Sequence, residues 1–129
     1  MTLVDTSIWI EVFRQRRALD MARLIDFDDV VTCLPVVQEV LQGFREEGAY
    51  RLACDAMLAL PIVESPLGVD VVLEAAGLYR AARARGVTVR SSVDCLIAAC
   101  ALRHDLEVLH RDRDFDALAR VSPLRQRRA

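Results

Sequence analysis

Five acidic side chains stand where a carboxylate could do chemistry. Asp5 directly follows the short apolar run TLV, and Asp112 and Asp114 follow the run EVL. Asp94 stands near the start of SSVDCLIAACAL, which is apolar on nearly every face beyond it, and Glu39 flanks the apolar stripe of PVVQEVLQGF. A carboxylate at the edge of an apolar core is costly unless it finds hydrogen-bond donors or a cation. These acids are therefore the candidates for a catalytic or metal-binding site.

Each of these acids also has a purely structural interpretation. Asp5 and Asp112 suit helix N-caps, because a carboxylate accepts amide hydrogens at a helix start. Asp94, three residues after Ser91, fits a capping box, and Glu39 fits an exposed helix face. The functional interpretation gains weight if the fold brings the acids together.

Four acids in one pocket would need a divalent cation. Two carboxylates about 5 Å apart repel by roughly 3 kcal/mol at an effective dielectric constant near 20. A set of oxygen ligands without a His or Cys pattern favours Mg²⁺ or Mn²⁺ over zinc. Ions held in this way suit phosphodiester hydrolysis, because their charge stabilises the transition state at phosphorus. No Ser-His-Asp arrangement competes, since neither His104 nor His110 has a neighbouring nucleophile in a matching motif.

The elements that must position these acids alternate between short apolar runs and longer helical patterns. This rhythm predicts an α/β fold with a mostly parallel sheet and helices on both faces, because right-handed crossovers pass through the helices. In such a sheet, ligands bind outside the carboxyl ends of the strands. We expect strands at residues 3–4, 30–33, 61–63 and 107–109, and helices at residues 6–17, 18–27, 35–47, 50–60, 69–85, 92–104 and 114–120, with Gly48 and Gly86 each ending a helix.

Composition and charge limit the class of protein. The chain has 129 residues, of which 53% are hydrophobic, which suits one packed domain over residues 1–129 with a frayed basic tail at 124–129. The net charge is −2 and all 17 basic residues are arginines, so any contact with nucleic acid must come from local patches. The four cysteines show no zinc-binding spacing, and neither a signal peptide nor a membrane-length apolar run is present. We therefore expect a cytoplasmic protein that does not enter a membrane.

The motifs taken together resemble one family. VDTS near the start, the acid Glu39, the helix SSVDCLIAACAL and the closing LHRDRDFD are similar, in this order and spacing, to the PIN-domain ribonucleases, and in particular to the VapC-type toxins of toxin-antitoxin pairs. The resemblance covers essentially the whole chain. It implies a central parallel sheet of five strands and an acidic pocket that binds Mg²⁺ or Mn²⁺ and cleaves RNA.

The resemblance also implies roles for individual residues. The catalytic and metal-binding quartet would be Asp5, Glu39, Asp94 and Asp112. Asp114 would be a nearby supporting metal ligand. Thr6 and Ser7 of the DTS motif would support the pocket, with the Ser7 hydroxyl orienting it. His110 stands where many relatives have Thr or Ser, and we assign it to the supporting residues.

The resemblance implies partners as well. The usual partner of such a toxin is a VapB-type antitoxin that blocks the acidic pocket, and the toxins commonly form homodimers. Arginines clustered before Asp94 or flanking Asp112 are candidate contacts for RNA phosphates: Arg80, Arg83, Arg85, Arg90, Arg111 and Arg113. Trp9 is expected in the core or the dimer interface.

Three other classes fit parts of the sequence. A phosphoacceptor signalling domain also places acids at strand ends, but it relies on a lysine and the chain has none. A dinucleotide-binding domain would need G-x-G-x-x-G after the first strand, where Asp5 and Thr6 stand. A PIN fold that binds without cleaving is the third alternative, and the complete quartet argues against it.

Overall fold

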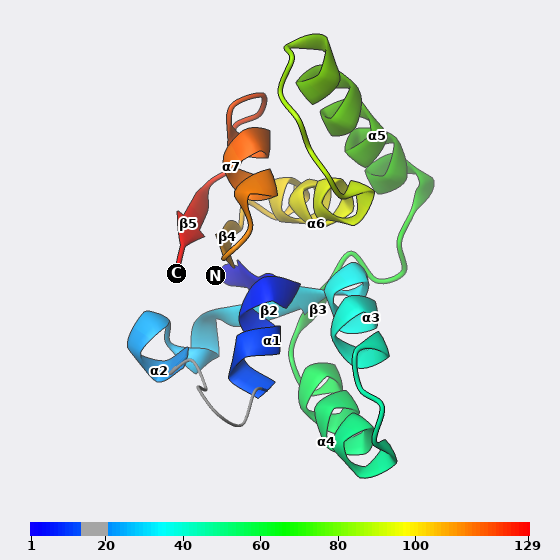
Figure 1. Ribbon diagram of the computed structural model, residues 1–129, viewed down its shortest axis with the longest axis vertical. Coiled ribbons are helices and arrows are strands. Elements are labelled where there is room, and N and C mark those ends of the chain that lie inside the picture. Colours follow the sequence, from blue (N-terminus) through cyan, green and yellow to red (C-terminus); the bar gives the residue numbers. More distant parts are fainter. Residues whose placement is uncertain (14–20) are drawn as a thin grey trace.

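The computed structural model describes residues 1–13 and 21–129, which form one parallel sheet with helices packed around it (Figure 1). The sheet order is β3-β2-β1-β4-β5, and each neighbouring pair is parallel. The strands are β1 (Thr2–Val4), β2 (Val30–Cys33), β3 (Ile62–Val63), β4 (Glu107–His110) and β5 (Gln126–Arg128). The expected α/β class with a five-stranded parallel sheet is confirmed.

The central strands β1 and β2 are buried along their whole length. Because successive side chains of a strand point to opposite faces, both faces of the sheet must be covered there. The helices between the strands supply this cover, as parallel crossovers require. They are α1 (Thr6–Phe13), α2 (Met21–Leu24), α3 (Leu34–Gln42), α4 (Glu47–Leu58), α5 (Val69–Ala84), α6 (Ser92–Arg103) and α7 (Arg113–Ala119), with a 3-10 turn at Phe27–Asp29.

Helix α6 is an interior helix, as its apolar sequence predicts. Most of its residues from Asp94 to Ala101 are buried, and Ile97 has no exposed surface. Phe115 of α7 is likewise fully buried and anchors the segment LHRDRDFD in the core. Trp9 is 5% exposed and its indole N–H donates to the Val4 carbonyl, so it belongs to the core.

The boundary between α3 and α4 differs from the predicted one. We expected one helix over residues 35–47 that Gly48 ends, but α3 ends at Gln42 with Gly43 as its C-cap. Helix α4 begins at Glu47 because the carboxylate of Glu46 accepts the N–H groups of Gly48 and Ala49 at 2.7 Å. Gly48 therefore lies in the first turn of α4 and does not end a helix, because Glu46 acts as the N-cap just before it.

The carboxyl-terminal segment is a strand, and the expectation of a frayed basic tail at 124–129 is wrong. Strand β5 pairs with β4, with Gln126 beside Val108 and Arg128 beside His110. Its arginines have acidic partners on neighbouring elements, which offset their charge: Arg125 with Asp105, Arg127 with Glu107 and Arg128 with Asp116. Pairing and charge neutralisation together hold this polar segment on the edge of the sheet.

The first two predicted helices are described only in part. Helix α1 is described from Thr6 to Phe13, in agreement with the prediction, and residues 14–17 of the first predicted helix lie outside the described residues, as do 18–20 of the second. The second ends at Leu24, because Asp26 caps the 3-10 turn that follows.

All four cysteines are free thiols. None of the described helices combines the length and apolar character needed to cross a bilayer.

Candidate metal centre

Two adjacent strands place the first two acids. Strands β1 and β4 run parallel with Val4 beside Leu109, so the chain leaves both at the same edge of the sheet. Asp5 follows at once, and its N–H donates to the Leu109 carbonyl at 2.9 Å. Asp112 comes two residues after β4 and is the N-cap of α7. The structure therefore puts both acids outside neighbouring strand ends, the expected place for a ligand.

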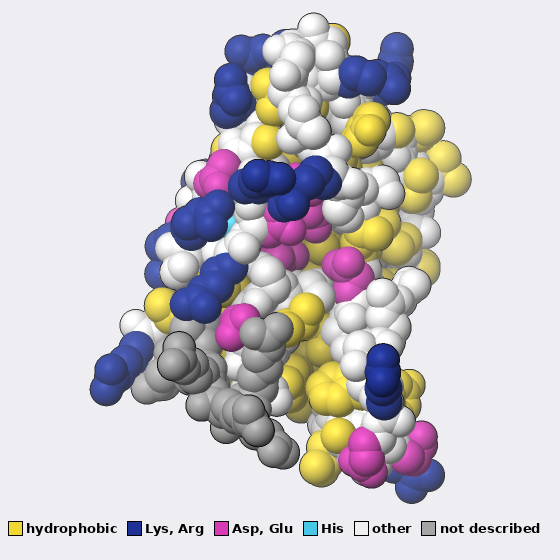
Figure 2. All heavy atoms as spheres, viewed as in Figure 1, with side chains coloured by type: hydrophobic (Ala, Val, Ile, Leu, Met, Phe, Trp, Pro, Cys, Tyr) yellow, Lys and Arg dark blue, Asp and Glu magenta, His cyan; other side chains and the backbone are white. Residues whose placement is uncertain are grey.

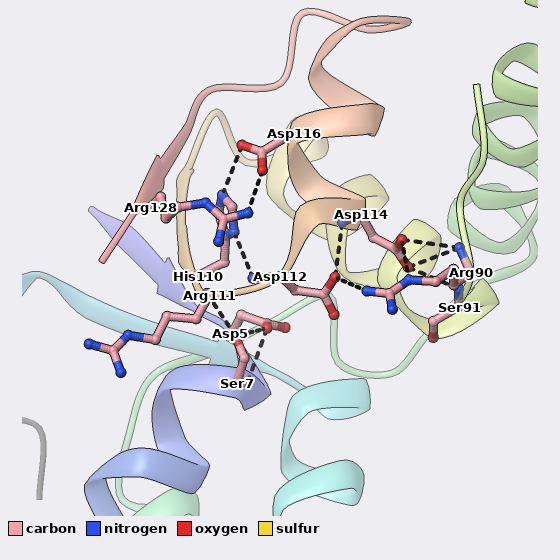
Figure 3. Close-up of polar contacts among 10 residues, drawn as sticks. All are labelled: Asp5, Ser7, Arg90, Ser91, His110, Arg111, Asp112, Asp114, Asp116 and Arg128. Atoms are coloured by element: carbon pink, nitrogen blue, oxygen red, sulfur yellow. Dashed lines mark hydrogen bonds and ion pairs between the residues drawn. The ribbon is translucent and has the colours of Figure 1, made fainter. Parts of the chain in front are cut away.

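The starts of α6 and α7 bring three carboxylates together. Oxygen atoms of Asp94, Asp112 and Asp114 all lie within 4.8 Å of one another. We call these three residues the acidic cluster. On the face of the molecule drawn in Figure 2, acidic side chains gather near the middle, with basic side chains beside them. Figure 3 shows the Asp112 and Asp114 carboxylates on either side of the Arg90 guanidinium.

The donor set fits a divalent cation. Asp5 is 2% exposed and Asp94 is 5% exposed. In residues 1–13 and 21–129, Asp5 Oδ1 and Asp94 Oδ2 are the buried side-chain oxygens that lack a hydrogen-bond partner. A buried carboxylate oxygen left without a donor is costly. Oxygen ligands of this kind suit a hard cation such as Mg²⁺ or Mn²⁺. Asp94 belongs to the acidic cluster, whereas Asp5 is not one of its three carboxylates.

Glu39 lies at the side of this arrangement. Its carboxylate accepts a hydrogen bond from Thr6 Oγ1 at 2.9 Å, and the side chain is half-buried on α3. Burial raises the pKa of Glu39 and the negative charges of Asp5 and Asp112 raise it further, although the Thr6 bond opposes them. Glu39 thus belongs to the same negative field without joining the acidic cluster. Thr6 holds it there, as a supporting residue would.

Burial and mutual repulsion favour protons on two of the acids. Burial raises the pKa of Asp94 to about 9, and the carboxylates of Asp114, Asp5 and Asp112 add to the effect. Burial also raises the pKa of Asp5, against the hydrogen bonds that it accepts from Ser7. A divalent cation would reverse both shifts, because it stabilises the ionised forms.

Asp114 is the exception and is held as an anion. Burial alone would raise its pKa, but its carboxylate accepts the backbone N–H of Arg90 at 3.1 Å and that of Ser91 at 2.9 Å. A hydrogen bond from the protonated Asp94 also stabilises the ionised form of Asp114. Together these donors lower the pKa of Asp114. No sequence signal identifies these donors, because they are main-chain groups brought from before α6. Ser91 caps nothing with its own hydroxyl, so the capping box with Asp94 is absent.

One of the six candidate arginines touches the acidic cluster. Arg90 places Nη2 at 3.4 Å from Asp112 Oδ1 and Nε at 3.6 Å from Asp114 Oδ1, and its side chain is 53% exposed. Arg111 and Arg113 are exposed, and Figure 3 shows the Arg111 side chain directed away from the carboxylates. Basic charge therefore meets the site chiefly through Arg90.

The three arginines of α5 and its carboxyl end have other contacts. Arg83 lies over the Tyr79 ring, 5.7 Å from its centroid. Arg85 donates to the Arg120 carbonyl at 2.8 Å, and Arg80 is exposed beside the hollow between α5 and α6. The structure does not bring these arginines to the acidic cluster.

Two polar side chains organise the loop between β4 and α7. Ser7 Oγ donates to Asp5 and accepts the N–H of Arg111 at 2.9 Å, so it ties the two strand ends together. His110 is fully buried at the end of β4 and accepts the N–H of Asp112. Its other ring nitrogen contacts Gln126 of β5, a residue that sequence reasoning missed because it assigned that segment to a tail.

The fold and the site define a class: an open parallel α/β protein with a carboxylate cluster, suited to a divalent cation, at its central strand ends. The family model of the PIN domain matches residues 2–121. Ribonuclease VapC11 of Mycobacterium tuberculosis is 40% identical over 132 residues, with 96% of each chain covered. Ribonuclease VapC51 of the same species is 33% identical over 122 residues, covering 93% of this chain and 86% of the relative.

A solved structure agrees with these relatives. The crystal structure of VapBC-5 from Mycobacterium tuberculosis, a member of the VapBC family of toxin-antitoxin systems, contains a chain that superposes with a TM-score of 0.73 at 25% identity, over 99% of this chain and 98% of that one. The chain therefore belongs to the PIN-domain family, in its VapC group.

The raised pKa of Asp94 predicts that the cation-free protein loses stability as pH rises. The folded chain keeps the Asp94 proton to about pH 9, whereas the unfolded chain releases it near the ordinary pKa of 3.8. Between these values the folded state binds the extra proton, so the free energy of unfolding should fall by up to about 1.4 kcal/mol per pH unit. Asp94→Asn should flatten the fall, as measured by urea unfolding in chelator.

The matched control is Asp70→Asn, which changes an exposed acid on α5 and should leave the slope as in the wild type. Equal slopes for the wild type and Asp94→Asn would contradict a protonated Asp94.

Proposed function

We propose that this chain is an endoribonuclease that depends on Mg²⁺ or Mn²⁺ and acts as the toxin of a VapBC-type pair in the cytoplasm. The observation that carries the proposal is that the acidic cluster contains a buried, unpartnered oxygen of Asp94, and that Asp5 has a second such oxygen at the end of the neighbouring strand β1. The names of the ribonuclease relatives support the activity, and the likeness to the VapBC-5 structure supports the toxin role.

The proposed site gives each residue a task. Asp94, Asp112 and Asp114, whose carboxylate oxygens lie within 4.8 Å of one another, would hold the cation together with Asp5, and Glu39 would adjoin them. A bound divalent cation supplies positive charge that activates water and stabilises the charge developing on the phosphate. Ser7 keeps Asp5 aimed into the site and also fixes the loop that carries Asp112.

Arginines at the rim would position the RNA. Arg90 is half-exposed beside the acidic cluster, and a planar guanidinium can bind a phosphate through two N–H groups. Arg111 and Arg113 are exposed on either side of Asp112 and could contact the adjoining phosphates. This local charge would let a protein of net charge −2 hold an anionic substrate.

Cleavage of total RNA by the purified chain tests the activity. We expect cleavage with Mg²⁺ or Mn²⁺, none with chelator, and a loss of about 100-fold or more in Asp5→Asn and Asp94→Asn, because each removes a charged ligand. Asp70→Asn on α5 should cleave as the wild type does. Cleavage that persists in chelator and in both site variants would refute the mechanism, and absence of cleavage by the wild type would leave a binding module.

We propose that a VapB-type antitoxin covers a hollow beside the site. The hollow of about 180 Å³ is lined by Ile10, Phe13, Val40 and Phe44, from α1, α3 and the residues that follow α3. The same helices carry Ser7 and Glu39, so a segment seated there would continue into the acidic pocket.

The antitoxin that we expect to be encoded beside this chain's gene should copurify with it and suppress cleavage. Ile10→Glu should weaken copurification, because it puts a charge into the apolar hollow, whereas Leu52→Glu on the exposed face of α4 should not. Equal copurification of both variants would place the antitoxin elsewhere.

We also propose that two copies pair through α5. This helix lies on the outside of α6 (Figure 1) and exposes Val69, Val72 and Leu73 by 50% or more, at the spacing of one apolar helix face. Beside that face, Val72, Tyr79 and Leu96 help to line a hollow of about 410 Å³. A second α5 would cover both features.

Light scattering after size-exclusion chromatography tests the pairing. The wild type should run as a dimer and Leu73→Glu as a monomer, because the charge would be buried in the interface. Leu58→Glu, at another exposed leucine, on α4, should remain dimeric. A wild-type monomer, or dimers of all three proteins, would contradict this interface.

A further inference from the structure

The imidazole of His110 lies between the metal centre and the last strand of the sheet. His110 ends β4, has no exposed surface, and packs against Phe115 with ring centroids 5.1 Å apart. Nδ1 lies 3.1 Å from the backbone nitrogen of Asp112, and Nε2 lies 2.6 Å from Oε1 of Gln126. Asp116 Oδ1 is 3.9 Å from Nε2, and the other oxygen of this carboxylate, Oδ2, is paired with Arg128.

These contacts select one form of the ring. The Asp112 N–H can only donate, so Nδ1 must accept and carries no hydrogen. Nε2 then carries the ring hydrogen and donates it to Gln126 Oε1. The neutral ring with hydrogen on Nε2 is therefore the form that satisfies both neighbours.

The hydrogen bonds fix Asp112 from two directions. Its N–H is held by His110, and its Oδ1 accepts the N–H of Asp114 at 2.9 Å. The carboxylate is thereby directed toward Arg90 and Asp114, as Figure 3 shows. A hydroxyl at position 110 could accept the same N–H, but its single oxygen could not also extend to β5. The histidine thus couples the carboxyl-terminal strand to the site.

We propose that Gln126 and His110 are positioning residues that set the cation affinity of Asp112, so that β5 is part of the metal centre. This proposal rests on the proposed function. Strand β5 presents Gln126 to the ring, and the N–H of Ala129 donates to the His110 carbonyl at 2.9 Å, which holds the strand in register. Partners that orient metal ligands typically change metal affinity by about 10-fold to 100-fold when they are removed.

Mn²⁺ binding by the full chain, followed by the electron paramagnetic resonance of free Mn²⁺, tests the proposal without an activity assay. Gln126→Leu removes the acceptor of the Nε2 hydrogen and should weaken Mn²⁺ binding about 10-fold, with a matching loss at limiting Mn²⁺ in RNA cleavage. Gln126→Glu keeps an acceptor and should stay within about threefold of the wild type. His110→Asn keeps an acceptor for the Asp112 N–H and should fall between these limits.

Arg127→Gln is the matched control, because it breaks an ion pair of β5 with Glu107 and leaves His110 and Gln126 untouched. It should bind Mn²⁺ as the wild type does. If the wild type binds Mn²⁺ and cleaves RNA, and Gln126→Leu binds Mn²⁺ as tightly as the wild type, the positioning role is overturned and the proposed function stands. A wild type that neither binds Mn²⁺ nor cleaves RNA would overturn the proposed function and this role together. Thermal unfolding of each variant identifies any that fails to fold. If the His110 variant fails to fold, the variants of the half-buried Gln126 still test the proposal.

Discussion

One unfavourable interaction governs the rest of the structure. Several carboxylates lie close together at an edge of the apolar core that water barely reaches, and their charged forms have a high free energy there. Asp5 and Asp94 are almost fully buried, and the pKa of each is raised by burial first and by neighbouring negative charge after it. Helix caps are normally exposed and need no such crowding. The crowded carboxylates are stable only if hydrogen-bond donors or positive charges offset this free energy, and the surrounding elements supply such groups.

The compensation comes mostly from groups that also build the fold. The main chain before α6 donates to Asp114, the Asp114 N–H donates to Asp112, and Ser7 joins Asp5 to the β4–α7 loop. Because these donors are fixed by the sheet and by helix starts, the carboxylates are oriented before any cation arrives. Such preorganisation is what a catalytic metal site requires of its protein.

Local patterns predicted most of this arrangement. Asp5 and Asp112 were found because each follows a short apolar run, and Asp94 because it opens an all-apolar helix. Strand β5 was missed because QRR has neither apolar alternation nor β-branched residues, and the contacts that hold it are non-local: main-chain pairing with β4 and ion pairs with distant acids. The same non-local contacts hid the role of Gln126, and the arginines of α5 were assigned by proximity in sequence, which the fold does not preserve.

Arg90 shows how the charge balance can serve both the cation-free protein and a substrate. Its contacts with Asp112 and Asp114, at 3.4 and 3.6 Å, are longer than the 2.7–2.9 Å or so of strong charge-assisted hydrogen bonds. The Arg90 side chain is half-exposed, so these contacts contribute little to stability. A guanidinium held this loosely offsets part of the negative field at small cost, and a phosphate that approaches the site can compete for it. Under the proposed function, the same arginine would screen the acids and then bind the RNA.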